Sequence, residues 1–155
     1  MAVLTASKVR PVQLAHGPLA KAELPMEGGI AETIYKGSIV ASDASSADGY
    51  FRALVSGANQ AADVFGGIAA EEQSIAAAQA DGDVVVSVYR NGVWGFAVGS
   101  IAITDIGAPI YASDDDTATT TSTTNQWIGH LEGIDGTYAW VNIELAFMKI
   151  ATAFA

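Results

Sequence analysis

The sequence contains no cysteine, and only 15% of its 155 residues are charged. The absence of cysteine excludes a disulfide framework, a cysteine-ligated zinc site and a cysteine nucleophile. A chain that is 50% hydrophobic and so sparsely charged is not intrinsically disordered, because disordered chains combine low hydrophobicity with dense charge. The composition therefore predicts one folded domain, with part of its weakly charged surface covered by a partner.

Long apolar runs are also missing. No stretch approaches 18 consecutive apolar residues, so we expect no membrane-spanning helix and no membrane partner. The early cations Lys8 and Arg10 precede a segment that Pro11, His16 and Pro18 interrupt, and we therefore expect no signal peptide.

Catalytic signatures are equally scarce. His16 and His130 are the only histidines, and the serines lack the glycine pattern of a nucleophile elbow. Neither glycine-rich nucleotide fingerprint is present. We therefore predict that the protein is not an enzyme and has no catalytic residues, cofactor or metal ion.

The strongest local cluster of chemical groups is Asp114-Asp115-Asp116. A Ca²⁺ loop spaces its carboxylates and adds a distal glutamate or backbone carbonyls, which three adjacent aspartates do not provide. We expect a solvated turn here, and the sequence leaves open whether the turn binds a cation.

The formal net charge of −10 is unevenly distributed along the chain. Residues 1–22 contain Lys8, Arg10 and Lys21 and no acidic residue, whereas from residue 63 onward 2 basic residues accompany 12 acidic ones. A chain this acidic repels phosphate, so we expect no nucleic-acid partner.

Residues 1–29 are predicted to form an extended arm, because Pro11, Pro18, Pro25 and Gly28-Gly29 interrupt any helical or strand period. A frayed terminus is the alternative. Apolar side chains give this arm anchors that a plain linker would lack, and such an arm is suited to lie on a neighbouring protein. The residues expected to contact a partner are Val3, Leu4, Lys8, Val9, Arg10, Val12, Leu14 and Leu19.

Residues 30–145 are predicted to form a β-rich body, either a small β-barrel or a β-sandwich, with at most one or two short helices. Eight short apolar runs bounded by turn residues carry this prediction: 33–41, 50–56, 64–69, 83–90, 93–98, 109–112, 126–131 and 138–145. Asn91-Gly92 predicts a type I′ hairpin between the fourth and fifth runs. Residues 69–80 are rich in helix formers and favour one or two helical turns, and residues 117–124 favour an edge strand or a mobile loop.

Residues 146–155 form an apolar tail that we expect to pack on the body or at an interface. Its spacing fits both a helix and the continuation of a strand, and we favour a strand that ends near Phe147. Four aromatic residues are candidates for an interface between subunits: Trp94, Trp127, Phe147 and Phe154. The alternative is that Trp94, Trp127 or Tyr138 stacks on sugars in a carbohydrate- or receptor-binding module.

The order of several segments resembles the head decoration, or capsid cement, proteins of tailed bacteriophages. The resemblance covers about residues 30–143 and depends on the order of its parts rather than on any single motif. The matching segments are 33–41 (TIYKGSIVA), Asp48-Gly49-Tyr50, 64–69 (VFGGIA), 81–88, 91–94 (NGVW), 105–112 (DIGAPIYA), Ile128-Gly129 and Trp140-Val141.

This resemblance implies a non-catalytic β protein on the outer surface of the virion, made in the host cytoplasm. Its partner would be the major capsid protein, which it would bind after head expansion, often as a homotrimer at local three-fold positions. In several such proteins an N-terminal arm clamps neighbouring capsid subunits, a role that residues 1–28 would fill here.

Overall fold

The computed structural model describes residues 4–13, 18–42, 49–54, 64–144 and 146, and Leu14, Phe147 and Phe154 lie outside this part. The described chain is mainly β, as the sequence predicts. Its strands are β1 (Val12–Gln13), β2 (Lys21–Pro25), β3 (Glu32–Ile34), β4 (Ile39–Ser42), β5 (Phe51–Ala53), β6 (Val64–Ala69), β7 (Gln73–Ile75), β8 (Val85–Tyr89), β9 (Val93–Ala97), β10 (Pro109–Ala112), β11 (Ala118–Thr119), β12 (Gln126–Ile134) and β13 (Tyr138–Asn142). One short 3₁₀ turn, η2, spans Ile103–Asp105.

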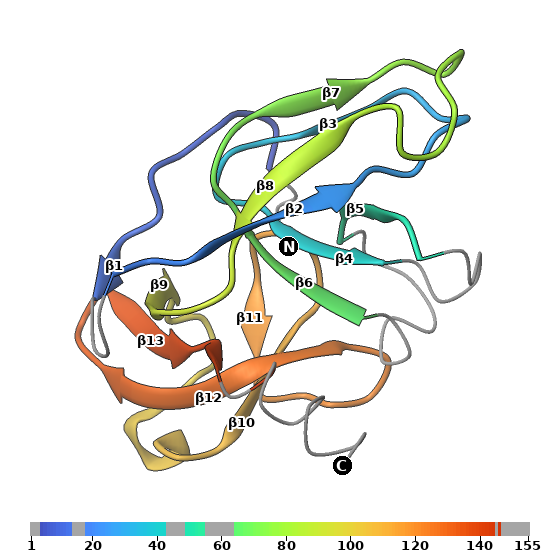
Figure 1. Cartoon of the computed structure of the whole chain (residues 1–155). Coiled ribbons are helices and arrows are strands. Elements are labelled where there is room, and N and C mark those ends of the chain that lie inside the picture. The colour runs from blue at the N-terminus through green and yellow to red at the C-terminus, as the bar shows by residue number, and fades with distance from the viewer. Residues whose placement is uncertain (1–3, 14–17, 43–48, 55–63, 145, 147–155) are drawn as a thin grey trace, which may run out of the picture.

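The strands form antiparallel sheets arranged in layers (Figure 1). A six-stranded sheet has the order β1-β9-β13-β12-β10-β11, and a five-stranded sheet has the order β2-β8-β6-β4-β5. The third sheet consists of β3 and β7 alone. In Figure 1 the five-stranded sheet lies between the other two.

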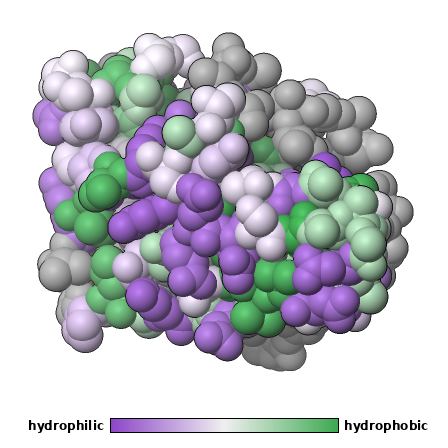
Figure 2. Space-filling model, turned by 90° about the horizontal axis from the view of Figure 1, so that it is seen from above, coloured by the Kyte–Doolittle hydropathy of each residue, from purple (hydrophilic) through white to green (hydrophobic). Residues whose placement is uncertain are grey.

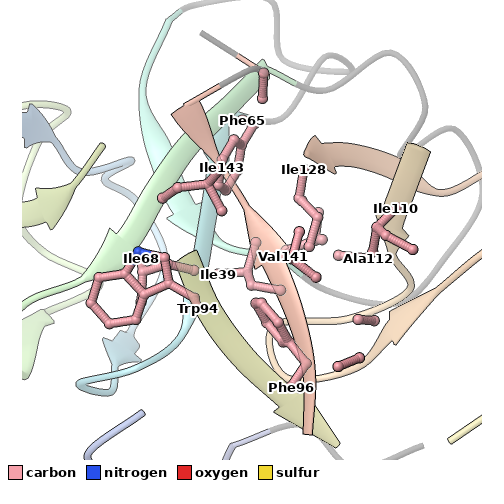
Figure 3. Packing of buried hydrophobic residues seen from close by; sticks show 14 of the residues in the cluster. Ile39, Phe65, Ile68, Trp94, Phe96, Ile110, Ala112, Ile128, Val141 and Ile143 are labelled. Atoms are coloured by element: carbon pink, nitrogen blue, oxygen red, sulfur yellow. The ribbon is translucent and has the colours of Figure 1, made fainter. Parts of the chain in front are cut away.

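Two apolar clusters hold the layers together. The larger one joins Ile39 and Ile68 of the five-stranded sheet to Trp94, Phe96 and Val141 of the six-stranded sheet (Figure 3). The smaller one packs side chains from the opposite face of the five-stranded sheet, such as Val40, against β3 and β7. All four residues of β4 are therefore buried, because both faces of that strand are covered.

The turn at Asn91-Gly92 does not close a hairpin, which corrects the sequence-based prediction. β8 pairs with β2 and β6, whereas β9 pairs with β1 and β13 in the other sheet. A type I′ turn needs a positive φ at both central residues, and only Gly92 has one, at 101°. The Asn91 side chain instead accepts a hydrogen bond from Ala20 N at 2.7 Å and donates one to Pro18 O at 2.9 Å.

Two further expectations are corrected. Residues 69–80 contain no helix, because the buried Ile75 belongs to strand β7, which pairs with β3. The last strand ends at Asn142 rather than near Phe147, and the Asn142 side chain accepts a hydrogen bond from Glu144 N at 3.0 Å. Of the two alternatives for residues 117–124, an edge strand or a mobile loop, the edge strand is present as β11 at the border of the six-stranded sheet.

The predicted N-terminal arm contributes one edge strand to each large sheet. β1 borders the six-stranded sheet through its pairing with β9, and β2 borders the five-stranded sheet through its pairing with β8. The described N-terminal residues thus form strands that lie on their own body. No helix among the described residues has the length and apolar character needed to cross a membrane.

Candidate functional site

The residues from Leu4 to Gln13, which we call the strap, are fixed to the body by backbone and side-chain hydrogen bonds. Lys8 N donates to Lys36 O at 3.0 Å, and Gly95 N donates to Pro11 O at 2.9 Å. The strap passes close to Gly37, whose φ is 90°. A Cβ atom at Gly37 would lie 2.9 Å from Lys8 O, so this position accepts the strap only as glycine.

Arg10 is the most deeply buried cation of the strap, with a side chain that is 2% exposed. Its Nε and Nη2 atoms donate to Gly37 O at 3.0 and 2.9 Å, and its Nη1 atom donates to Gly95 O at 3.3 Å. Nη2 also donates to Asp116 Oδ1 at 2.7 Å, and the guanidinium lies 4.2 Å from the centroid of the Phe96 ring. Burial lowers the pKa of Arg10, and the hydrogen bond and charge of Asp116 oppose that shift.

The three aspartates are not a solvated turn, and this prediction is wrong. Asp114 is 0% exposed and Asp115 is 1% exposed, whereas Asp116 is partly buried and pairs with both Arg10 and Lys8. Asp114 Oδ1 accepts hydrogen bonds from the backbone N–H groups of Asp116 and Thr117, at 2.9 and 2.8 Å. The strap supplies the cations that make burial of this acidic turn tolerable.

Asp115 connects the acidic turn to both the strap and the β3–β4 turn. Its Oδ1 atom accepts a hydrogen bond from Leu4 N at 3.0 Å, and its Oδ2 atom accepts one from Ser38 Oγ at 2.9 Å. Burial raises the pKa of Asp115, and these two hydrogen bonds partly lower it again. The three carboxylates thus serve different partners, and no set of three or more metal-ligating side chains is found within the described ranges.

The raised pKa of Asp115 predicts the sign of a pH effect. Above about pH 4 the Asp115 carboxyl group is deprotonated in the unfolded chain but still protonated in the folded one, because its folded pKa is raised. The free energy of unfolding therefore falls as the pH rises through the folded pKa. Asp115→Asn cannot titrate, so its stability relative to wild type should increase as the pH rises through this range. Urea unfolding at several pH values measures the difference. Asp135→Asn is the opposite-sign control, because hydrogen bonds from Tyr138 N, Thr137 N and Trp140 Nε1 lower the pKa of Asp135. If the difference in free energy of unfolding between wild type and Asp115→Asn does not change with pH, the pKa of Asp115 is not raised by burial.

The structure separates the residues expected to contact a partner. Arg10 is enclosed by its own chain, and Val12 and Leu19 pack against the larger apolar cluster. Val9, by contrast, is 81% exposed. The sequence shows no sign of this division, because the hydrogen-bond partners of Arg10 lie 27 to 106 residues away. Val3 and Leu14 lie outside the described residues.

The aromatic candidates divide in the same way. Trp94 is 3% exposed and donates a hydrogen bond from Nε1 to Asn91 O at 2.8 Å, so its ring lies inside the body rather than on the outer surface. Trp127 is half-buried, and its ring lies 5.5 Å from that of His130 in an edge-on arrangement. Tyr138 is also half-buried and lies 5.6 Å from Trp140.

Comparison with known proteins identifies no relative. No protein-family model, curated protein or solved structure was found to match this chain.

Proposed function

We propose that this chain is a structural virion protein that binds the outer surface of a phage head and stabilises the expanded head by bridging major capsid protein subunits. The observation that carries the proposal is the order of segments along residues 30–143, which resembles head decoration proteins. The antiparallel β body is compatible with that resemblance.

Exposed apolar side chains on the surface support a binding role. Five large apolar side chains are well exposed among the described residues: Val9, Val64, Val85, Ile103 and Ile106. Ile103 and Ile106 belong to one turn and are 68% and 50% exposed. Figure 2 shows one face of the molecule, on which apolar patches are separated by polar residues. Separate small apolar contacts suit a protein that binds several neighbours at once, because linked weak contacts multiply in affinity.

The strap changes how the contact with the capsid is proposed to form. Arg10 and Lys8 neutralise Asp116 within the chain, and we assign them to holding the strap in place. The exposed side of the strap around Val9 is then the part that faces a capsid subunit. A strap already ordered before binding costs less entropy on association than a free arm would.

The proposal predicts that the purified protein binds expanded heads assembled from the major capsid protein of the same virus. Cryo-electron microscopy of the mixture should show regular density at symmetry-related positions, and the decorated heads should break at a higher temperature than bare heads. Unexpanded heads and heads without the protein are the controls. Absence of density at micromolar protein, or specific binding on a glycan array in its place, would overturn the proposal.

A further inference from the structure

A pocket opens between the strap and the body, on the side of the strap that carries Val9. It encloses a volume of about 130 Å³. The N-terminal segment, the β3–β4 turn and the ends of β6, β8 and β9 all contribute to its wall. The lining residues are Lys8, Val9, Arg10, Val12, Leu19, Lys36, Gly37, Ala69, Tyr89 and Trp94.

The interior of the pocket is predominantly apolar. Tyr89 and Trp94 form one wall with ring centroids 5.3 Å apart, and the side chains of Val12 and Leu19 pack beside them. A cavity of about 150 Å³ accommodates a benzene-sized group. The pocket under the strap is slightly smaller, at about 130 Å³, which suits one aliphatic side chain or most of one aromatic ring.

Positive charge gathers around this pocket in a protein whose net charge is −10. Three of the seven basic residues of the chain line it: Lys8, Arg10 and Lys36. A fourth, Lys21, places its Nζ atom 5.4 Å from the centroid of the Tyr89 ring.

These cations are not all neutralised by the chain itself. Asp116 pairs with Lys8 and Arg10. Within the described part of the chain, neither the exposed Lys36 nor the exposed Lys21 takes part in an ion pair. Lys36 lines the pocket, and Lys21 lies near Tyr89, which is one of its lining residues. Two exposed ammonium groups therefore accompany the apolar interior.

We propose that this pocket receives one aliphatic or aromatic side chain from an acidic segment of a capsid subunit, with Lys36 and Lys21 facing its carboxylates. The apolar interior favours a peptide side chain, and the two cations favour acidic neighbours around it. The inference rests on the proposed function for the identity of the partner, whereas the chemistry of the pocket does not depend on it.

Short peptides test the pocket without any head. The probes are acetylated, amidated Asp-Asp-Phe-Asp-Glu, the same peptide with Ala in place of Phe, and Lys-Lys-Phe-Lys-Lys. Binding is followed through the NMR signal of the Trp94 indole N–H, identified by its loss in Trp94→Phe. We expect the acidic Phe peptide to shift this signal and to bind at least tenfold more tightly than its Ala counterpart, since burial of one aromatic side chain is worth about that factor.

Lys36→Glu should weaken binding of the acidic Phe peptide by at least threefold at low salt and by less at high salt, because the attraction is screened. Ala108→Glu, which introduces a glutamate near η2 outside the pocket lining, should leave binding unchanged. Both positions are partly or fully exposed, so both variants should fold. Equal binding of the acidic and basic peptides, or no effect of Lys36→Glu, would overturn the proposal.

The same variants separate failure of the pocket from failure of the proposed function. If wild type and Lys36→Glu decorate heads equally, the function stands and the pocket proposal is wrong. If the acidic Phe peptide binds but heads remain bare, the pocket chemistry stands and its capsid partner is wrong. Sedimentation measures the oligomeric state of both proteins. If wild type forms an oligomer and Lys36→Glu is a monomer, the occupant of the pocket is a second copy of the chain, and the capsid assignment is overturned.

Discussion

Replacing Asp116 by alanine is expected to lower the free energy of unfolding by about 3 kcal/mol, because removal of one partner of a buried ion pair leaves the other charge uncompensated. The Arg10 side chain is 2% exposed and would lose the carboxylate oxygen that lies 2.7 Å from Nη2. Lys8 adds little to this loss, because its side chain is 39% exposed and water can solvate it. Urea unfolding followed by circular dichroism measures the effect.

Two variants show whether the loss of stability in Asp116→Ala comes from the unpaired Arg10 guanidinium. Glu71→Ala removes an exposed carboxylate and should change the free energy of unfolding by less than about 0.5 kcal/mol. Arg10→Met combined with Asp116→Ala should recover much of the stability, because methionine fills a similar volume without charge. If Asp116→Ala costs no more than Glu71→Ala, the ion pair does not hold the strap.

Gly129→Ala is expected to destabilise the protein by about 3 kcal/mol through steric overlap and backbone strain. Gly129 has a φ of 156°, and a Cβ atom there would lie 2.1 Å from Asn142 O of the neighbouring strand β13. Backbone atoms cannot move aside as a flexible side chain can. The residue also lies where the pairing of β10 with β12 changes register between Ile110 and Tyr111, so the sheet depends on its unusual conformation.

Gly133→Ala provides a matched control in the same strand. A Cβ atom at Gly133 meets nothing within 4 Å, so this variant should stay within about 0.5 kcal/mol of wild type. Thermal unfolding of both variants gives the comparison. Equal stability of the two would mean that β12 and β13 separate readily and that the close approach at Asn142 is not a constraint.

The positions of the strands could be predicted from the sequence because they depend on local signals. The run at 64–69 matches β6, and the run at 109–112 matches β10, with turn residues near both. The pairing of strands could not be predicted in the same way. Asn91-Gly92 carries the local chemistry of a hairpin, but the side chain of Asn91 binds residues 18 and 20, more than 70 residues earlier in the chain.

The candidate site was only partly visible in the sequence. The contrast between a basic N-terminus and three adjacent aspartates was a signal for contact between them, although it equally suited a contact with another protein. The pocket had no local signal, because Leu19, Lys36, Ala69 and Trp94 come from four separate parts of the chain.

The sequence by itself determined the β class of this protein, the places of most strands and the acidic net charge with its basic N-terminus, because periodicity, turn chemistry and charge are properties of neighbouring residues. Only the tertiary structure decided that the strap lies on its own body and that Arg10 and the aspartates are buried together. The reason is that a charge can be buried only where its partner arrives, and Asp116 reaches Arg10 from 106 residues away.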